Sequence, residues 1–317
     1  MSLDNSQIDP IKLEIIANGL RSIADECFVA LMRSSYSTNI KERKDHSIAI
    51  VDRKGRLVVQ AALTLPIHIA SMGGLMKCVL EKFGDDIHEG DIFIANDPHI
   101  AGGTHLPDIN YAMPVFVEGE LVAFICNIAH HADIGGMVPG SMAGGMSEIY
   151  QEGLRIPVVK LFRKGVLQQD IMDLLLLNVR VPEERQGDHN AQIASCKLGK
   201  RRFMEVVGVH GLPAVLTAFD EIIGRTATRM RAIIAEIPNG VYEFEDFMDG
   251  DGIDTFDIPI RLKLTVDGDR IHLDFTGTSP QVKGNINTTM NAVQASVNYA
   301  LIAALDSEMP SNQGVLD

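Results

Sequence analysis

Histidine and aspartate residues gather in one short stretch of this chain, residues 96–136. Four of the ten histidines lie there together with three aspartates: His99, His105, His130, His131, Asp97, Asp108 and Asp133. Imidazole and carboxylate are the usual protein ligands of zinc, manganese and iron. Their clustering at the ends of apolar runs predicts a metal site.

The residue pattern around this stretch predicts a β-hairpin. Residues 111–117 and 121–129 are rich in β-branched and aromatic side chains, which is typical of strands. Glu118 and Gly119 between them fit a two-residue turn, in which glycine supplies a positive φ. Pro114 interrupts the first strand and indicates a sheet edge or a bulge at that position.

The turn sets the pairing of the two strands and thereby the position of the possible ligands. With a two-residue turn, His130 at the open end of the hairpin faces Pro107, and Ala129 faces Asp108. This register brings Asp108 and His130 to the same end of the hairpin as His105. A slip of one residue would turn the side chains to the other face of the sheet.

Composition excludes several classes of protein. The 317 residues are 46% hydrophobic and 22% charged, which is ordinary for a soluble globular protein of one or two domains. The net charge of −14 argues against partners such as nucleic acids and anionic membranes. The polar N-terminus is unlike a secretory signal, and no apolar run reaches the ~18 residues of a membrane-spanning helix. The four cysteines are far apart and favour reduced thiols, so we expect a soluble cytoplasmic protein.

The remaining pattern predicts an α+β fold with mixed or antiparallel sheets, packed helices and a metal site carried by the hairpin. Asp9 is expected to cap the first helix, with Pro10 at its first position. We expect helices at residues 10–35, 69–83, 169–177, 191–207, from 213 to about 237, and 288–306. We expect further strands at residues 47–51, 56–60, 92–95, 241–246, 257–266 and 270–275.

A shift of composition at residues 238–240 divides the chain. We expect an α+β domain with the metal site over residues 1–237 and a more β-rich second part over residues 238–317. Residues 135–145 contain five glycines and are either a flexible loop or a lid beside the metal site. Glu148 and Glu152 are four residues apart, which on a helix predicts one solvated face.

Several short motifs, taken in their order along the chain, resemble the hydantoinase B/oxoprolinase family. This family includes B subunits of ATP-dependent N-methylhydantoinases, the C-terminal part of 5-oxoprolinases, related lactamases, and the α subunits of acetone and acetophenone carboxylases. The motifs cover residues 42–45, 66–68, 96–98, 103–108, 129–136, 148–153, 187–192 and 275–279. The resemblance extends along nearly all of the chain.

The resemblance implies a division of labour between two subunits. A hydantoinase A-type partner with an actin-like ATPase fold would bind ATP and phosphorylate the substrate oxygen, and the B-type chain would carry the metal. The ligands of the carboxylase branch, His-x-x-Asp and a downstream His, map onto His105, Asp108 and His130. Members of the family are usually longer than this chain, so we expect a truncated or shortened member.

The leading hypothesis is ATP-dependent hydrolysis of a cyclic amide or imide such as a hydantoin or 5-oxoproline. Zinc, manganese or iron bound by the three ligands would lower the pKa of a water molecule and orient it. His131 and Asp133 are the candidate proton acceptors, although Asp133 could instead hold a ligand imidazole in its tautomer.

Four residues of the family-like motifs are candidates to line the substrate pocket: Asp45, His68, Asn96 and Asp97. Asn96 and Asp97 precede a proline and are equally typical of a turn. Two other functions remain open for the chain as a whole. One is an α-type subunit of a ketone carboxylase, and the other is a non-catalytic structural subunit in which a metal only stabilises the hairpin.

Overall fold

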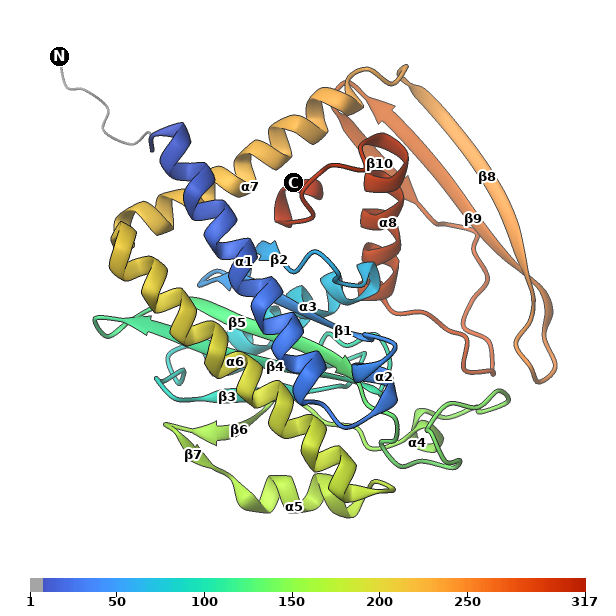
Figure 1. Ribbon diagram of the computed structural model, residues 1–317. Coiled ribbons are helices and arrows are strands. Elements are labelled where there is room, and N and C mark those ends of the chain that lie inside the picture. The colour runs from blue at the N-terminus through green and yellow to red at the C-terminus, as the bar shows by residue number, and fades with distance from the viewer. Residues whose placement is uncertain (1–7) are drawn as a thin grey trace.

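The computed structural model describes residues 8–317 of the chain. The polar stretch that argues against a secretory signal, residues 1–6, lies outside the described residues. Two antiparallel sheets and the helices packed around them form the described part, which Figure 1 shows. The predicted α+β class is therefore confirmed.

A seven-stranded antiparallel sheet lies at the centre, with the strand order β2-β1-β5-β4-β3-β6-β7. Its strands are β1 (His46–Asp52), β2 (Leu57–Gln60), β3 (Ile92–Ala95), β4 (Asp108–Val117), β5 (Glu120–His130), β6 (Val159–Arg163) and β7 (Val166–Leu167). The long hairpin of β4 and β5 occupies the middle of the sheet, with β1 beside β5 and β3 beside β4.

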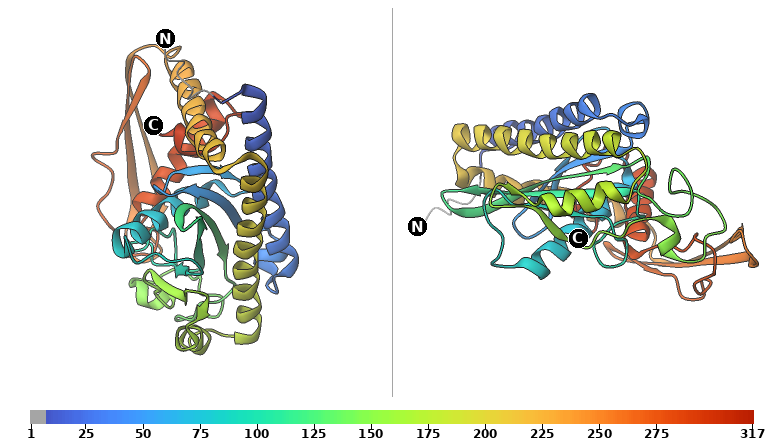
Figure 2. Two further views of the ribbon diagram at one scale, coloured as in Figure 1. Left: turned by 90° about the vertical axis from the view of Figure 1, so that its left-hand side faces the viewer. Right: turned by 90° about the horizontal axis from the view of Figure 1, so that it is seen from below.

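Helices cover both faces of this sheet (Figure 2). α1 and α6 pack side by side on one face, where their apolar side chains meet those of β1, β2 and β5. α3 packs on the other face. The helices of this part are α1 (Pro10–Ser34), α2 (Thr38–Lys41), α3 (Pro66–Phe83), α4 (Ile149–Glu152), α5 (Gln169–Leu177), α6 (Pro182–His210) and α7 (Leu212–Ile234).

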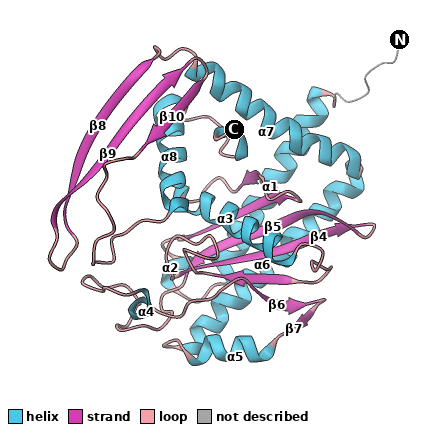
Figure 3. Ribbon diagram, turned by 180° about the vertical axis from the view of Figure 1, so that it is seen from behind, coloured by secondary structure: helices cyan, strands magenta, loops and turns pink. Residues whose placement is uncertain are grey.

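A smaller sheet of three strands stands apart from the central sheet, as Figure 3 shows. It consists of β8 (Gly240–Gly250), β9 (Phe256–Asp267) and β10 (Arg270–Asp274), and it is followed by α8 (Met290–Leu305) and a short 3-10 helix, η1 (Gln313–Val315). Its small core includes Met230 and Ile234 of α7, and α8 lies against α3. Residues 238–317 therefore pack directly on α7 and α3, and the division of the chain at residues 238–240 stays a prediction.

Capping residues place the first helix as predicted. Asp9 Oδ1 accepts the N–H groups of residues 11 and 12, at 2.9 Å and 3.0 Å, and Pro10 is the first helical residue. The predicted start of α6 at residue 191 is wrong, because the helix already begins at Pro182. Its first turns bury polar side chains, so they lack the apolar periodicity on which the prediction depends.

The turn of the β4–β5 hairpin also agrees with its prediction. Glu118 and Gly119 both have positive φ angles, of 52° and 85°, and Val117 faces Glu120. Positive φ at both central residues is the geometry that suits the twist of a hairpin.

The predicted register at the open end of the hairpin is wrong by one residue. A bulge shifts the pairing after Phe116, so that Val115 faces Ala123 and Asp108 faces His130 directly. β3 pairs with β4 only at residues 110–112, which leaves β4 without its second neighbour beyond that point. The extra residue is Val122 of β5, which lies just past the last β1–β5 pair at Ala123, so few ladder hydrogen bonds oppose the bulge on either side of the hairpin.

Among the described residues, no single helix is both long and apolar enough to cross a membrane. α6 and α7 meet such a criterion only when taken together, and they are bent at 108° to each other. All four cysteines are free.

Candidate metal centre

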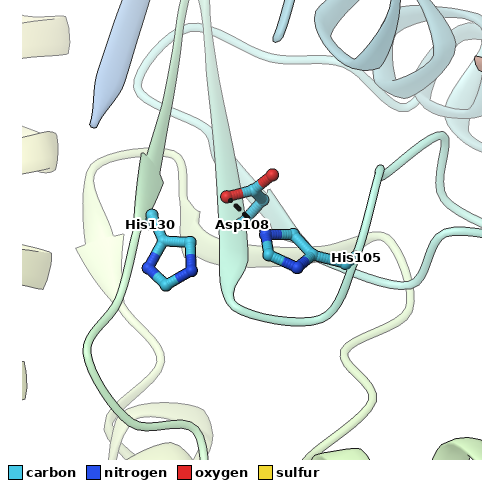
Figure 4. Close-up of side chains that lie close together, drawn as sticks. All are labelled: His105, Asp108 and His130. Carbon is cyan, nitrogen blue, oxygen red and sulfur yellow. Dashed lines mark ion pairs between the residues drawn. The ribbon is translucent and has the colours of Figure 1, made fainter. Parts of the chain in front are cut away.

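Three side chains meet at the open end of the β4–β5 hairpin. Asp108 is the first residue of β4 and faces His130, the last residue of β5, while His105 lies in the loop before β4. Figure 4 shows the three side chains turned toward one another. One ligand atom from each lies within 4.8 Å of the others. The bulge therefore creates the convergence that the predicted register had placed one residue away.

Asp108 is buried, and its charge is balanced by histidines. Its Oδ1 lies 3.2 Å from His105 Nε2, and its Oδ2 lies 3.7 Å from His68 Nε2 and accepts a hydrogen bond from Thr104. Burial alone would raise the pKa of Asp108, but the charges of His105 and His68 outweigh burial and lower the pKa. The carboxyl group is thus held in its ionised form, which is the form that binds metals.

The donor set fits a divalent metal ion. Oδ1 of Asp108 is buried and has no partner in hydrogen-bonding geometry, although His105 lies within ion-pair distance. Two imidazoles and a carboxylate provide two nitrogen ligands and one oxygen ligand, which suits zinc, manganese and iron alike. A buried oxygen without a hydrogen bond is costly unless another group satisfies it, and a cation would do so.

Asp45 and His68, two of the predicted substrate-binding residues, lie beside the three ligands. His68, near the start of α3, is buried, and its Nδ1 lies 2.8 Å from Ser47 Oγ. Its Nε2 lies 3.6 Å from Asp45 Oδ1. The structure therefore brings both residues next to Asp108.

Asn96 and Asp97 are placed differently, because their side chains bind the protein itself. Asn96 Nδ2 donates to the carbonyl groups of Leu106 and Leu154, and Asp97 accepts the N–H groups of residues 99 and 100 and pairs with Arg155 at 2.6 Å. Both are fully buried. These contacts hold the loop that carries His105, whereas substrate binding by either side chain stays a prediction without a supporting contact.

His131 contacts a cluster of buried polar side chains beneath α6. Its Nε2 lies 2.8 Å from Gln192 Oε1, and its ring lies 4.5 Å from that of His189. Burial lowers the pKa of His131 to about 4. None of these contacts joins His131 to the three ligands, so its predicted role as a proton acceptor gains no support from them.

Asp133 organises the glycine-rich loop. Its two oxygens accept the backbone N–H groups of Gly135, Gly140 and Arg180, and the Arg180 guanidinium pairs with it at 3.0 Å. Burial alone would raise its pKa, but these hydrogen bonds lower it. The contacts describe a structural anchor, and no imidazole is among them.

Asp133→Asn distinguishes the two kinds of role that the sequence leaves open for Asp133, namely proton acceptor and structural support. An amide nitrogen would face groups that are all donors, so we expect the free energy of unfolding to fall by about 2 kcal/mol. Urea unfolding measures this loss, with the exposed Asp170→Asn as the control. Unchanged stability together with a large loss of turnover would instead support a role as proton acceptor.

The glycine-rich loop lies beside the three ligands. Met142 Sδ is 3.3 Å from His130 Nε2, and Ser141 accepts the N–H of Ile134 at 2.8 Å. The position agrees with the interpretation of residues 135–145 as a lid. Movement of this loop stays a prediction.

A cleft of about 440 Å³ opens at His105. Thr104 and Glu152 line one side, and residues 278–289, which follow the small sheet, line the other. The predicted solvated face is therefore wrong for Glu152, whose carboxyl is partly buried with its pKa raised by burial. In the sequence, only the place of Glu152 in the 148–153 motif indicated that this residue lies at the site.

Metal affinity is expected to depend on pH through His105. Burial alone would lower its pKa, but Asp108 raises the pKa above 6.5. In the metal-free protein this attraction stabilises the fold fully below pH 6.5 and is lost as the pH rises through the raised pKa. A metal must displace the same proton, so its affinity should fall about tenfold per pH unit below that pKa. Titration with Mn²⁺ between pH 5 and 8 would measure this, and a flat profile would contradict it.

Comparison with known proteins gives a consistent picture. The chain matches the model of the hydantoinase B/oxoprolinase family over residues 9–317. The B-type subunit of a putative D-/L-hydantoinase from Pseudomonas sp. (strain NS671) is 32% identical over 99% of this chain and 55% of its own length. The crystal structure of the ATP-dependent caprolactamase from Pseudomonas jessenii superposes with a TM-score of 0.91 at 32% identity, over 98% of this chain and 53% of that chain.

An acetone carboxylase solved without nucleotide has the same fold. It superposes with a TM-score of 0.90 over 99% of this chain and 43% of that chain, at 23% identity. The chain thus spans about half the length of the hydantoinase and caprolactamase chains that it matches.

Proposed function

Because this chain belongs to the hydantoinase B/oxoprolinase family, we propose that it is the metal-bearing part of a B-type subunit of an ATP-dependent hydrolase of cyclic amides or imides. The observation that carries this proposal is the meeting of His105, Asp108 and His130 at the mouth of a polar cleft. A divalent zinc, manganese or iron ion held there would supply Lewis acidity and lower the pKa of a water molecule.

The surrounding residues have distinct tasks in this proposal. Asp108 supplies the negative charge, and Nε2 of His68 lies between its carboxylate and that of Asp45, so His68 helps to hold the two acidic side chains beside the centre. Glu152 faces the cleft beside His105, and burial raises the pKa of its carboxyl, so it is more readily protonated than an exposed glutamate and can take part in proton exchange. Residues 278–289 line the side of the cleft opposite Glu152.

The proposed reaction needs a partner. A lactam carbonyl resists attack by water because resonance with the ring nitrogen keeps its carbon poorly electrophilic. A hydantoinase A-type ATPase would transfer the terminal phosphoryl group of ATP to that oxygen, which makes it a leaving group. Water then bonds to the carbon, and the ring C–N bond breaks as the nitrogen takes up a proton, which leaves an acyl phosphate. A second water hydrolyses the acyl phosphate to the ring-opened carboxylate and phosphate. Because the ATPase is a separate chain, we propose a cytoplasmic hetero-oligomer. In support, relatives are named as the B-type subunit of a putative hydantoinase and as an ATP-dependent caprolactamase.

An α-type subunit of a ketone carboxylase is the second candidate, because the acetone carboxylase has the same fold. We prefer the hydrolase because the hydantoinase and caprolactamase relatives are 32% identical, against 23% for the carboxylase. A purely structural subunit is the third. It predicts that metal removal lowers the melting temperature but leaves the activity of the complex intact.

The deciding experiment combines this chain with an A-type partner and measures ATP turnover and ring-opened product. Hydantoin, 5-oxoproline and caprolactam are tested against a ketone with bicarbonate. We expect a cyclic amide to stimulate turnover and to be opened. Turnover stimulated only by ketone and bicarbonate would overturn the hydrolase proposal.

A further inference from the structure

A chain of contacts leads from α6 to the metal centre through the short helix α2. It begins at Asp188, which is fully buried in α6. Asp188 Oδ1 accepts the backbone N–H groups of Tyr36 and Ser37, at 2.8 Å and 3.0 Å, and Arg185 lies 3.3 Å from its other oxygen. α6 therefore holds the two residues that immediately precede α2.

Gly187, the residue before Asp188, allows α6 to approach Tyr36 closely. A Cβ atom on Gly187 would lie 2.3 Å from Cδ2 and 2.5 Å from Cγ of Tyr36. Cγ is the first ring atom, so a Cβ on Gly187 would require the exposed Tyr36 side chain to leave this position or residues 36–37 to shift. Glycine inside a helix usually costs about 1 kcal/mol relative to alanine, and this close approach explains its presence.

The next link is Asn39 in α2. Its side-chain Nδ2 lies 2.8 Å from Nδ1 of His130, and its backbone carbonyl oxygen accepts the N–H of Asp45 at 3.0 Å. The neighbouring Ile40 is fully buried and anchors α2 in the core. Asn39 thus contacts both a ligand side chain and the backbone of a residue beside the centre.

This contact matters because a metal-binding imidazole uses only one of its two nitrogens. The other nitrogen normally donates to an acceptor, which fixes the tautomer and the ring orientation. Figure 4 shows one ring nitrogen of His130 turned toward Asp108 and His105, and the other is the one that Asn39 contacts. A half-turn of the Asn39 amide puts its carbonyl oxygen in the same place, so the residue can accept the Nδ1 proton.

We infer that Asn39 is a positioning residue for His130, and that Gly187 and Asp188 of α6 hold Asn39 in place through residues 36–37. The inference rests on the proposed metal site. It makes the α6–α2 contact a determinant of metal affinity, although neither element supplies a ligand.

The first test replaces Asn39 with leucine and with aspartate and measures Mn²⁺ affinity by competition with a chelator. Asn39→Leu keeps the volume but not the acceptor, and we expect affinity to fall by about 10- to 100-fold. Asn39→Asp keeps an acceptor for the Nδ1 proton and should retain affinity. Lys41→Ala, an exposed change in the same short helix, is the control. Unchanged affinity in Asn39→Leu, or equal losses in both variants, would overturn the inference.

The second test uses a matched pair of glycines in α6. Gly187→Ala would displace the Tyr36 side chain that packs on α6 and loosen residues 36–37, so we expect weaker Mn²⁺ binding. In Gly208→Ala the added Cβ meets nothing within 4 Å, so we expect wild-type binding and a more stable helix. Wild-type affinity in Gly187→Ala would remove α6 from the inference.

A third measurement separates this inference from the proposed function. If the wild-type chain binds no Mn²⁺, Zn²⁺ or Fe²⁺, the metal proposal fails. The imidazole ¹⁵N signals of His130 in the metal-free protein then test Asn39 directly. We expect the tautomer signals to differ between the wild type and Asn39→Leu, and identical signals would overturn the positioning role.

Discussion

Asp108→Asn is expected to abolish metal binding at this centre. Asp108 is the only anionic ligand, and its Oδ1 is the buried oxygen without a hydrogen bond. Asparagine has nearly the same shape but no charge, so we expect Mn²⁺ affinity to fall by more than about 100-fold. This loss is larger than the loss of about 10- to 100-fold that is usual when a residue that only supports a ligand is replaced. Elemental analysis and chelator competition measure this, and turnover with an A-type partner should fall in parallel.

The controls for this variant are one change at the centre and one away from it. His105→Ala should lose metal in the same way, whereas the exposed Asp85→Asn should behave as the wild type. Near-stoichiometric metal in purified Asp108→Asn would rule out the assigned ligand set.

Asp108→Asn is also expected to change the stability of the metal-free protein. The pKa of Asp108 is lowered in the folded protein from 3.8, so its charge contributes stability above that pH, and the contribution is lost as the pH falls further. The melting temperature of metal-free Asp108→Asn should therefore lie below that of the wild type at pH 7. The difference should shrink below pH 3.8.

Gly102→Ala is expected to be the most disruptive glycine substitution near the site. Gly102 has a φ of +76°, and an added Cβ would lie 2.1 Å from the carbonyl carbon of Gly74 and 2.3 Å from the nitrogen of Leu75 in α3. Backbone atoms cannot rotate away, so α3 and the loop that carries His105 would have to separate. We expect the free energy of unfolding to fall by about 3 kcal/mol or more, and metal affinity to fall with it.

Gly73→Ala is the matched control for this prediction. Gly73 lies inside α3 next to the contact, and a Cβ there meets nothing within 4 Å. Because alanine favours helices, we expect a neutral change or a gain of up to about 1 kcal/mol. Urea unfolding of both variants measures the contrast, and wild-type stability in Gly102→Ala would contradict the argument.

Local features of this protein could be predicted well from the sequence. The cap at Asp9, the turn at Glu118 and Gly119, and most of the longer helices and strands depend on neighbouring residues, and the structure has them near the predicted positions. The short elements α2, α4, β6 and β7 were not predicted. The start of α6 could not be predicted in the same way. Its first turns bury Asp188 and His189 against other elements, so apolar periodicity is absent there.

Contacts between distant segments account for the rest of the candidate site. His68 reaches Asp108 from α3, Asn39 reaches His130 from α2, and Glu152 reaches the cleft from α4. No motif spacing relates these positions to one another. Conversely, Asn96 and Asp133 have side chains typical of active sites, yet they bind the backbone of nearby loops and, for Asp133, the Arg180 guanidinium.

The sequence by itself determined the types of ligand, their positions near the open end of a hairpin and the two-residue turn that forms it. Tertiary structure alone decided that Asp108 and His130 face each other, because the pairing shifts by one residue at a bulge. The bulge lies where β4 has run past the end of β3. In a strand, a shift of one residue exchanges the two faces. Here the extra residue is Val122 of β5, which lies just past the end of the β1–β5 pairing, so the shift depends on contacts with distant segments.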